Sequence, residues 1–170
     1  MGGWEDGRIG GEGGLGGENG QRMWHRRRPD SMFPPSYWQT GLYMIRTFKE
    51  LDVWRNAVEL AMRVFECTQS FPREERYSLT DQVRRSSRSI SANIAEAWHK
   101  RRYPASFVSK LSDAECEAAE TQTWIEHALR CSFCSPEEAA GLDRHCASII
   151  GQLVNMSQAP ERWCTTVSRD

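Results

Sequence analysis

The stretch SPEEAAGLDRHCASIIGQLVNM, residues 135–156, decides the fold class. Ser135, Pro136 and Glu138 form the pattern of a helix start: a capping serine, a proline in the first turn, and a glutamate that completes a capping box. The apolar positions that follow are spaced three and four residues apart: Ala139, Leu142, Cys146, Ile149, Leu153 and Met156. This 3-4 alternation is typical of the seam of a helix bundle. The stretch therefore predicts a helix with one buried face.

Three earlier segments show helical periodicity as well. The first begins with a predicted capping box at Thr47 and Glu50, and its expected buried stripe is Leu51, Trp54, Val58, Ala61 and Phe65. The second begins with Ser78 and Asp81 as a predicted cap, and its stripe is Leu79, Val83, Ile90, Ile94 and Ala97. It ends before Pro104, because a proline disfavours helix at the preceding residue. The third has the stripe Phe107, Leu111, Ala114, Ala118, Ile125 and Ala128. Four helices with short connections over residues 44–170 predict an all-α, up-down-up-down antiparallel four-helix bundle.

The N-terminal part of the chain has a different composition. Ten of the 13 glycines lie in residues 1–20, and a stretch with prolines and the basic run Arg26–Arg28 follows. Such a composition cannot bury a core, so we predict that residues 1–43 form a disordered leader. Because the helical pattern begins close to Met44, we also hypothesise that Met44 is the true initiator. A nucleic-acid-binding arm at Arg26–Arg28 is an alternative use of the leader.

The totals exclude several classes of protein. The chain has 170 residues, 39% of them hydrophobic, and a formal net charge of -1, so the protein as a whole has no charge that would attract nucleic acid or membrane. No run of about 18 apolar residues and no secretory signal occurs, which predicts a cytoplasmic protein without a membrane span. Six cysteines in such a chain predict reduced thiols and not a disulfide framework.

Three blocks carry a family resemblance: FKELDVWRNAVELA (48–61), FPREERYSLTDQVRRSSRSISANIAEA (71–97) and AAETQTWIEHAL (118–129). Together they resemble the small four-helix bundle proteins whose genes were first noticed in intervening sequences of 23S ribosomal RNA. The resemblance extends over about residues 48–164. Residues 93–96 match the family's Asn-Ile-Ala-Glu-Gly, with Ala97 in place of the glycine, and residues 120–122 match its Glu-Thr-Gln, whereas Ala118 replaces an acidic residue. The resemblance implies a homopentameric bundle without catalytic residues, and an association with ribosomal RNA that rests on gene location.

Charge is distributed unevenly between the second and third predicted helices. Residues 76–102 hold seven Lys and Arg against two Asp and Glu, whereas residues 105–131 hold two against five. Residues four apart share a helix face, so the basic helix could contact phosphates. The candidate nucleic-acid-binding residues are Arg84, Arg85, Arg88, Lys100, Arg101 and Arg102. Two alternatives stay open: the basic helix pairs with the acidic one, within the bundle or between subunits, or Lys100–Arg102 only oppose the helix dipole.

Polar residues near the apolar stripe of the second helix are candidates for structural or interface roles. We expect Asn93 to be partly buried and hydrogen-bonded, and Glu96 to pair with Lys100. Glu120 is the obvious second carboxylate for a catalytic pair with Glu96, but we favour structural roles for both. Apolar residues outside the main stripes favour an oligomer: Val53, Trp98, Trp124 and Ile150.

The cysteines raise the question of a metal site. Cys131 and Cys134 form a C-x-x-C, with His127 one turn earlier and Cys146 and Cys164 downstream. A zinc site needs a second clustered pair, and Cys146 sits on the seam of its helix, so we predict no metal and no cofactor. The sequence thus favours a non-enzymatic, homo-oligomeric scaffold with RNA or a ribonucleoprotein as its partner and no small-molecule substrate. A protein–protein adaptor without nucleic-acid affinity is the alternative.

Overall fold

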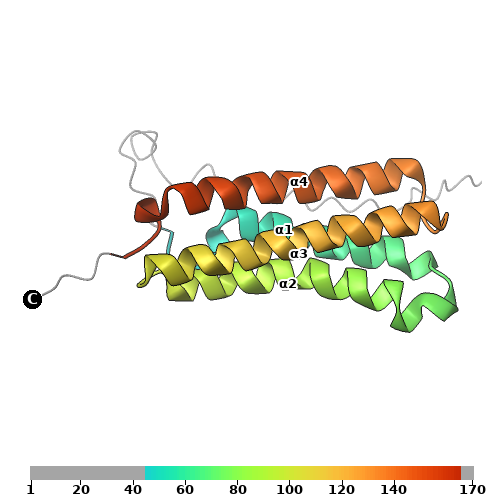
Figure 1. The fold of residues 1–170 in the computed structure, drawn as a ribbon, viewed down its shortest axis with the longest axis horizontal. Coiled ribbons are helices and arrows are strands. Elements are labelled where there is room, and N and C mark those ends of the chain that lie inside the picture. The colour runs from blue at the N-terminus through green and yellow to red at the C-terminus, as the bar shows by residue number, and fades with distance from the viewer. Residues whose placement is uncertain (1–44, 166–170) are drawn as a thin grey trace, which may run out of the picture. The chain divides into compact units, whose positions relative to one another are not determined.

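The structure, a computed structural model, describes residues 45–165. It contains four helices (Figure 1): α1 (Asp52–Cys67), α2 (Leu79–Lys100), α3 (Pro104–Arg130) and α4 (Pro136–Gln158). Short 3-10 helices flank them: η2 (Phe48–Glu50), η3 (Thr68–Ser70), η4 (Arg73–Tyr77) and η5 (Pro160–Arg162). No residue from 45 to 165 lies in a strand, so the predicted all-α class is confirmed. The predicted leader, Met44 and Arg26–Arg28 lie outside the described residues.

The four helices pack in chain order. Each helix contacts the next, and α1 also contacts α4, which closes the ring. The most extensive contact is between α2 and α3, which lie side by side and are joined by a short turn. This arrangement is compatible with the predicted up-down-up-down order. No helix within residues 45–165 combines the length and the apolar composition that crossing a membrane requires.

The start and the buried face of α4 are as predicted. The Ser135 hydroxyl accepts a hydrogen bond from the Glu138 backbone at 3.2 Å, and the Glu138 carboxylate accepts one from the Ser135 backbone at 3.0 Å. The buried residues of α4 are the six predicted seam residues. In α3 the predicted stripe is also buried, with Thr121 in addition. In α2 it is joined by Thr80, Ser86, Ser87 and Trp98.

The prediction for α1 was wrong in phase. Its buried residues are Val53, Ala57, Leu60 and Val64 with the preceding Leu51, whereas Trp54, Val58, Ala61 and Phe65 are only half-buried. The reason lies at the start of the helix. Phe48–Glu50 forms a 3-10 turn, and Leu51 has an extended backbone, so the α-helical phase is set from Asp52. The Glu50 carboxylate accepts from the Arg46 backbone and not from Thr47, and no capping box forms there.

The predicted cap of α2 was also wrong. Neither Ser78 nor Asp81 caps this helix with its side chain. Instead the Glu75 carboxylate accepts hydrogen bonds from the Ser78 hydroxyl and from the Leu79 backbone, the second at 3.2 Å. These two bonds hold the pKa of Glu75 below its ordinary value. A glutamate of η4 therefore begins α2, which fixes η4 against the helix.

Candidate nucleic-acid interface

One face of α2 is exposed along the whole helix. Its members recur at helical spacing, and we call them the α2 stripe: Asp81, Arg85, Arg88, Ala92, Glu96, His99 and Lys100. Arg85 and Arg88 lie one turn apart and line a shallow hollow together with Asp81. The stripe thus presents two neighbouring guanidinium groups on a rigid helix.

The arginines of the stripe are not neutralised within the described chain. Among residues 45–165 neither Arg85 nor Arg88 forms an ion pair, although Arg85 donates a hydrogen bond to Gln82 at 2.6 Å. Glu117 of α3 is a charge on which Arg85 acts. Burial and the neighbouring Glu120 raise the pKa of Glu117, and Arg85 opposes that rise. The charge of Arg85 therefore acts on Glu117 of α3, although the two side chains form no ion pair or hydrogen bond in the described residues.

Arg84 is placed differently from Arg85 and Arg88. It lies at the edge of α2 that faces α1, where its Nε donates a hydrogen bond to the Thr68 hydroxyl at 2.7 Å. Its guanidinium carbon lies 4.7 Å from the centre of the Phe65 ring, a cation–π contact. The half-buried Arg84 side chain is thus directed toward α1 and does not join the exposed stripe.

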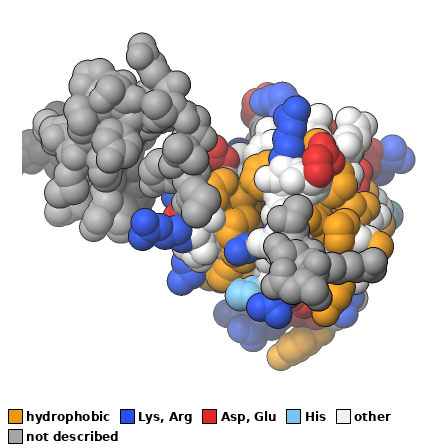
Figure 2. Space-filling model, turned by 90° about the vertical axis from the view of Figure 1, so that its left-hand side faces the viewer, with side chains coloured by type: hydrophobic (Ala, Val, Ile, Leu, Met, Phe, Trp, Pro, Cys, Tyr) orange, Lys and Arg blue, Asp and Glu red, His pale blue; other side chains and the backbone are white. Residues whose placement is uncertain are grey.

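The basic residues at the end of α2 also fall into two groups, exposed residues and a residue packed against an aromatic ring. Lys100 and Arg102 are exposed, whereas the Arg101 guanidinium carbon lies 3.7 Å from the centre of the Trp98 ring. This end of the bundle faces the viewer in Figure 2, where hydrophobic side chains lie between lysines and arginines. Four of the six predicted basic residues are therefore exposed (Arg85, Arg88, Lys100 and Arg102), and two are packed against aromatic rings.

Asn93 and Glu96 of α2 both contact Lys110, which was not among the predicted site residues. The Lys110 ammonium of α3 lies 3.0 Å from the Glu96 carboxylate, 3.1 Å from the Asp113 carboxylate and 3.3 Å from the Asn93 side-chain oxygen. The predicted Glu96–Lys100 pair was wrong, because Lys110 approaches Glu96 from the neighbouring helix. Glu96 and Asp113 raise the pKa of Lys110, which keeps it charged. The negative charge of Glu96 within the stripe is thereby compensated.

The two carboxylates considered for catalysis are not brought together. Glu120 accepts a hydrogen bond from the Trp124 indole at 3.0 Å, whereas Glu96 is held by Lys110. Lys110 and Glu120 are ten residues apart on α3, about 15 Å along the axis.

Two of the apolar residues expected to favour an oligomer are used inside the bundle. Val53 and Trp98 are only 3% and 7% exposed, whereas Trp124 and Ile150 are partly buried against the core. Val53 and Trp98 therefore supply no surface for subunit contacts.

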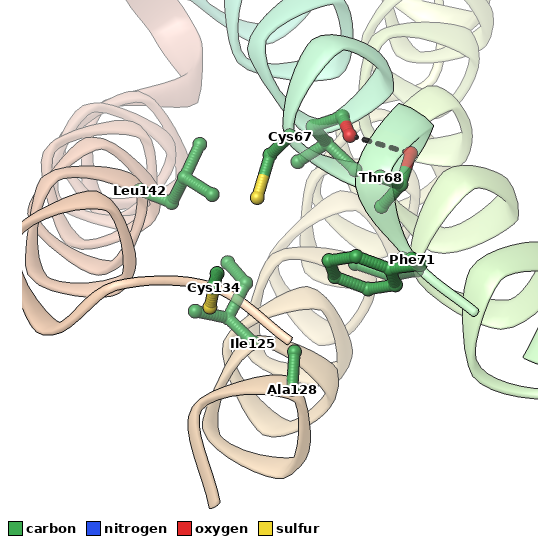
Figure 3. A pocket seen from close by; sticks show the side chains of 9 residues that line it. Cys67, Thr68, Phe71, Ile125, Ala128, Cys134 and Leu142 are labelled. Carbon is green, nitrogen blue, oxygen red and sulfur yellow. Dashed lines mark hydrogen bonds between the residues drawn. The ribbon is translucent and has the colours of Figure 1, made fainter. Parts of the chain in front are cut away.

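The thiols of the C-x-x-C have different surroundings. Cys134 and Cys67 both line a cavity of about 10 Å³ enclosed by side chains from all four helices and the segments next to them (Figure 3). Cys131 is exposed. The cavity walls are apolar, and burial raises the pKa of Cys67 to about 11 and that of Cys134 above its ordinary value. Cys146 is buried in the seam as predicted. Among residues 45–165 no three His, Cys, Asp or Glu side chains are arranged to hold a metal ion.

Comparison with known proteins identifies the family. No curated protein sequence matches the chain. A solved structure from Bacteroides thetaiotaomicron, described as a protein of unknown function from the S23 ribosomal protein family, is 28% identical and superposes with a TM-score of 0.57. The match covers 62% of this chain and 98% of that one. The family model for the 23S rRNA-intervening sequence protein matches residues 49–155, which include all of α1, α2 and α3 and most of α4. The chain therefore belongs to the 23S rRNA-intervening sequence protein family.

Proposed function

We propose that this chain is a non-enzymatic, cytoplasmic scaffold that assembles as a homo-oligomer, a pentamer, and binds RNA or a ribonucleoprotein through the α2 stripe. The observation that carries the proposal is the exposure of Arg85 and Arg88 without an ion-pair partner in the described residues. Two guanidinium groups one turn apart on a rigid helix suit contacts to neighbouring phosphates.

Lys100 and Arg102 extend this basic surface. Lys100 is 12 residues beyond Arg88, about 18 Å along the helix axis, so the surface has the length of several nucleotides. Glu96 lies between these two basic groups, and its ion pair with Lys110 compensates a negative charge that would otherwise repel phosphate. An oligomer would repeat the surface in each subunit, and repeated weak phosphate contacts would then act together.

A protein–protein adaptor is the second candidate. What favours it is the effect of Arg85 on Glu117 of α3, since Arg85 opposes the rise in the pKa of that carboxyl. In an oligomer the same two faces would meet between subunits. Arginines used in this way would not be available to RNA.

Binding of the full chain to a single-stranded RNA of mixed sequence separates the two candidates. We expect the double variant Arg85→Glu/Arg88→Glu to lose most of the affinity in fluorescence anisotropy. The matched control is Arg144→Glu/Arg162→Glu, which makes the same change of charge at exposed positions of α4 and η5. Equal affinity of both double variants would contradict the proposal. Light scattering of the wild type tests the assembly, because a pentamer has about five times the 19.5 kDa mass of one chain.

A further inference from the structure

A second basic site lies where α1 is connected to α2. The segments η3 and η4, with the neighbouring ends of the two helices, surround an open hollow of about 740 Å³. This volume is in the range of sites for small ligands. Three arginines line it, Arg73 and Arg76 from η4 and Arg84 from α2, and no lining residue is acidic. The hollow therefore concentrates positive charge in a concave surface.

Arg84 is already held in position within this hollow. The hydrogen bond to Thr68 and the contact with the Phe65 ring fix the plane of its guanidinium group. Within residues 45–165 its two terminal nitrogens have no hydrogen-bond acceptor, and none of the three arginines forms an ion pair. A half-buried charge without a counter-ion is unfavourable, so an anion with several acceptor oxygens would complete the arrangement.

An aromatic side chain stands at the same hollow. Tyr77 lines it and is 87% exposed, the highest value among the large hydrophobic side chains that protrude from the described residues. Exposed aromatic rings beside basic residues act as platforms on which nucleic acid bases stack. The acidic neighbour Glu75 does not compete for the arginines, because its carboxylate is bonded at the start of α2.

We infer that this hollow binds a nucleotide through its phosphate monoester, with the phosphate held by Arg84, Arg76 and Arg73 and the base stacked on Tyr77. The nucleotide is either free or the phosphorylated end of an RNA strand. The inference goes beyond the proposed function, because the hollow shares no residue with the α2 stripe. It stands or falls independently of RNA binding at Arg85 and Arg88.

Isothermal titration of the full chain with adenosine 5′-monophosphate, adenosine and inorganic phosphate tests the site. We expect the monophosphate to bind and adenosine not to bind. Arg84→Gln should weaken binding of the monophosphate about tenfold or more, the usual effect of losing a charge-assisted hydrogen bond. Arg144→Gln is the matched control, since it removes the same charge from an exposed position of α4 outside the hollow, and it should leave the affinity unchanged.

Further variants keep the test decisive. Arg84 contacts α1, so its replacement could disturb folding. Arg76 is exposed and forms no ion pair within residues 45–165, and Arg76→Gln should also weaken binding of the monophosphate. Tyr77→Ala should weaken the monophosphate but not inorganic phosphate. Short RNAs with a 5′-phosphate or a 5′-hydroxyl distinguish the two sources. Tighter binding of the 5′-phosphorylated RNA than of the 5′-hydroxyl RNA assigns the site to an RNA end, and equal binding of the two RNAs beside binding of the free monophosphate assigns it to a free nucleotide. Equal binding of adenosine and its monophosphate, or equal affinities of Arg84→Gln, Arg76→Gln and Arg144→Gln, would overturn the inference.

Discussion

Replacing the buried hydroxyl of Thr121 tests how α2 and α3 are held together. Thr121 and Ser86 are 0% and 1% exposed, and their hydroxyl oxygens lie 2.9 Å apart across the interface of the two helices. Each hydroxyl also reaches a carbonyl of its own helix, Glu117 at 2.8 Å and Val83 at 3.3 Å. Both buried hydroxyls therefore have hydrogen-bond partners within the protein.

The expected cost follows from these partners. Thr121→Val keeps the shape of the side chain but leaves the Ser86 hydroxyl with one partner only, so we expect a loss of about 1–2 kcal/mol in the free energy of unfolding. Ser86→Ala should cost about 1 kcal/mol, because Thr121 keeps its bond to Glu117. The double variant should cost less than the sum by about 1 kcal/mol, since the bond between the two hydroxyls is lost in each single variant and is counted twice in the sum.

Urea unfolding of the full chain, followed by circular dichroism, measures these changes. All variants are compared at one protein concentration, because assembly would make the apparent stability depend on concentration. Thr123→Val is the matched control: its hydroxyl also bonds the backbone of its own helix, at 3.0 Å to Ala119, but it is exposed and has no partner on α2. It should change stability by less than about 0.5 kcal/mol. Strict additivity of Ser86→Ala and Thr121→Val would refute the reasoning.

Three further predictions concern the cap of α4, the effect of pH and the thiols. Ser135→Ala removes one side of the capping box and should cost about 1 kcal/mol in urea unfolding; an unchanged midpoint would contradict the capping role. Burial and the nearby Arg63 lower the pKa of His145. The unfolded chain therefore binds a proton at His145 more readily than the folded chain does. The contribution of neutral His145 to the free energy of unfolding is complete above the pKa of the unfolded state and is lost as pH falls through the pKa of the folded state. Acidification from about pH 7.5 to about pH 5.5 should therefore destabilise the wild type more than His145→Gln, and equal losses would exclude the effect. Burial raises the pKa of the Cys146 thiol to about 12, whereas Cys116 is exposed. Iodoacetamide followed by mass spectrometry should modify Cys116 first in the native protein and both thiols in urea; similar native rates would show that the seam opens readily.

The sequence predicted most of the fold because a buried helical face is visible as periodicity. The seam of α4 is correct residue by residue, and its capping box is a local pattern that needs no knowledge of the other helices. The phase of α1 was missed because Leu51 is extended, and one extended residue between a 3-10 turn and a helix rotates every later side chain. Trp54 and Phe65 are apolar enough to suggest the wrong stripe.

The candidate site was predictable only in part. The exposure of Arg85 and Arg88 follows from the phase of α2, which was correct. The partner of Glu96 was not predictable, because its contact with Lys110 depends on how α2 and α3 are aligned along their axes, and periodicity does not contain that alignment. A lone lysine in an otherwise acidic stretch was the available signal. The position of Arg84 likewise depends on Thr68 and Phe65 of another segment.

The salt dependence of RNA binding tests the central claim most directly. For the full chain, the logarithm of the association constant should fall linearly with the logarithm of salt concentration, because phosphate contacts release counter-ions. Arg85→Gln/Arg88→Gln should reduce the steepness by about 1.4, since each lost contact to a single strand accounts for about 0.7. An unchanged slope in this variant, or binding that does not respond to salt, would contradict a role of the α2 stripe in binding RNA.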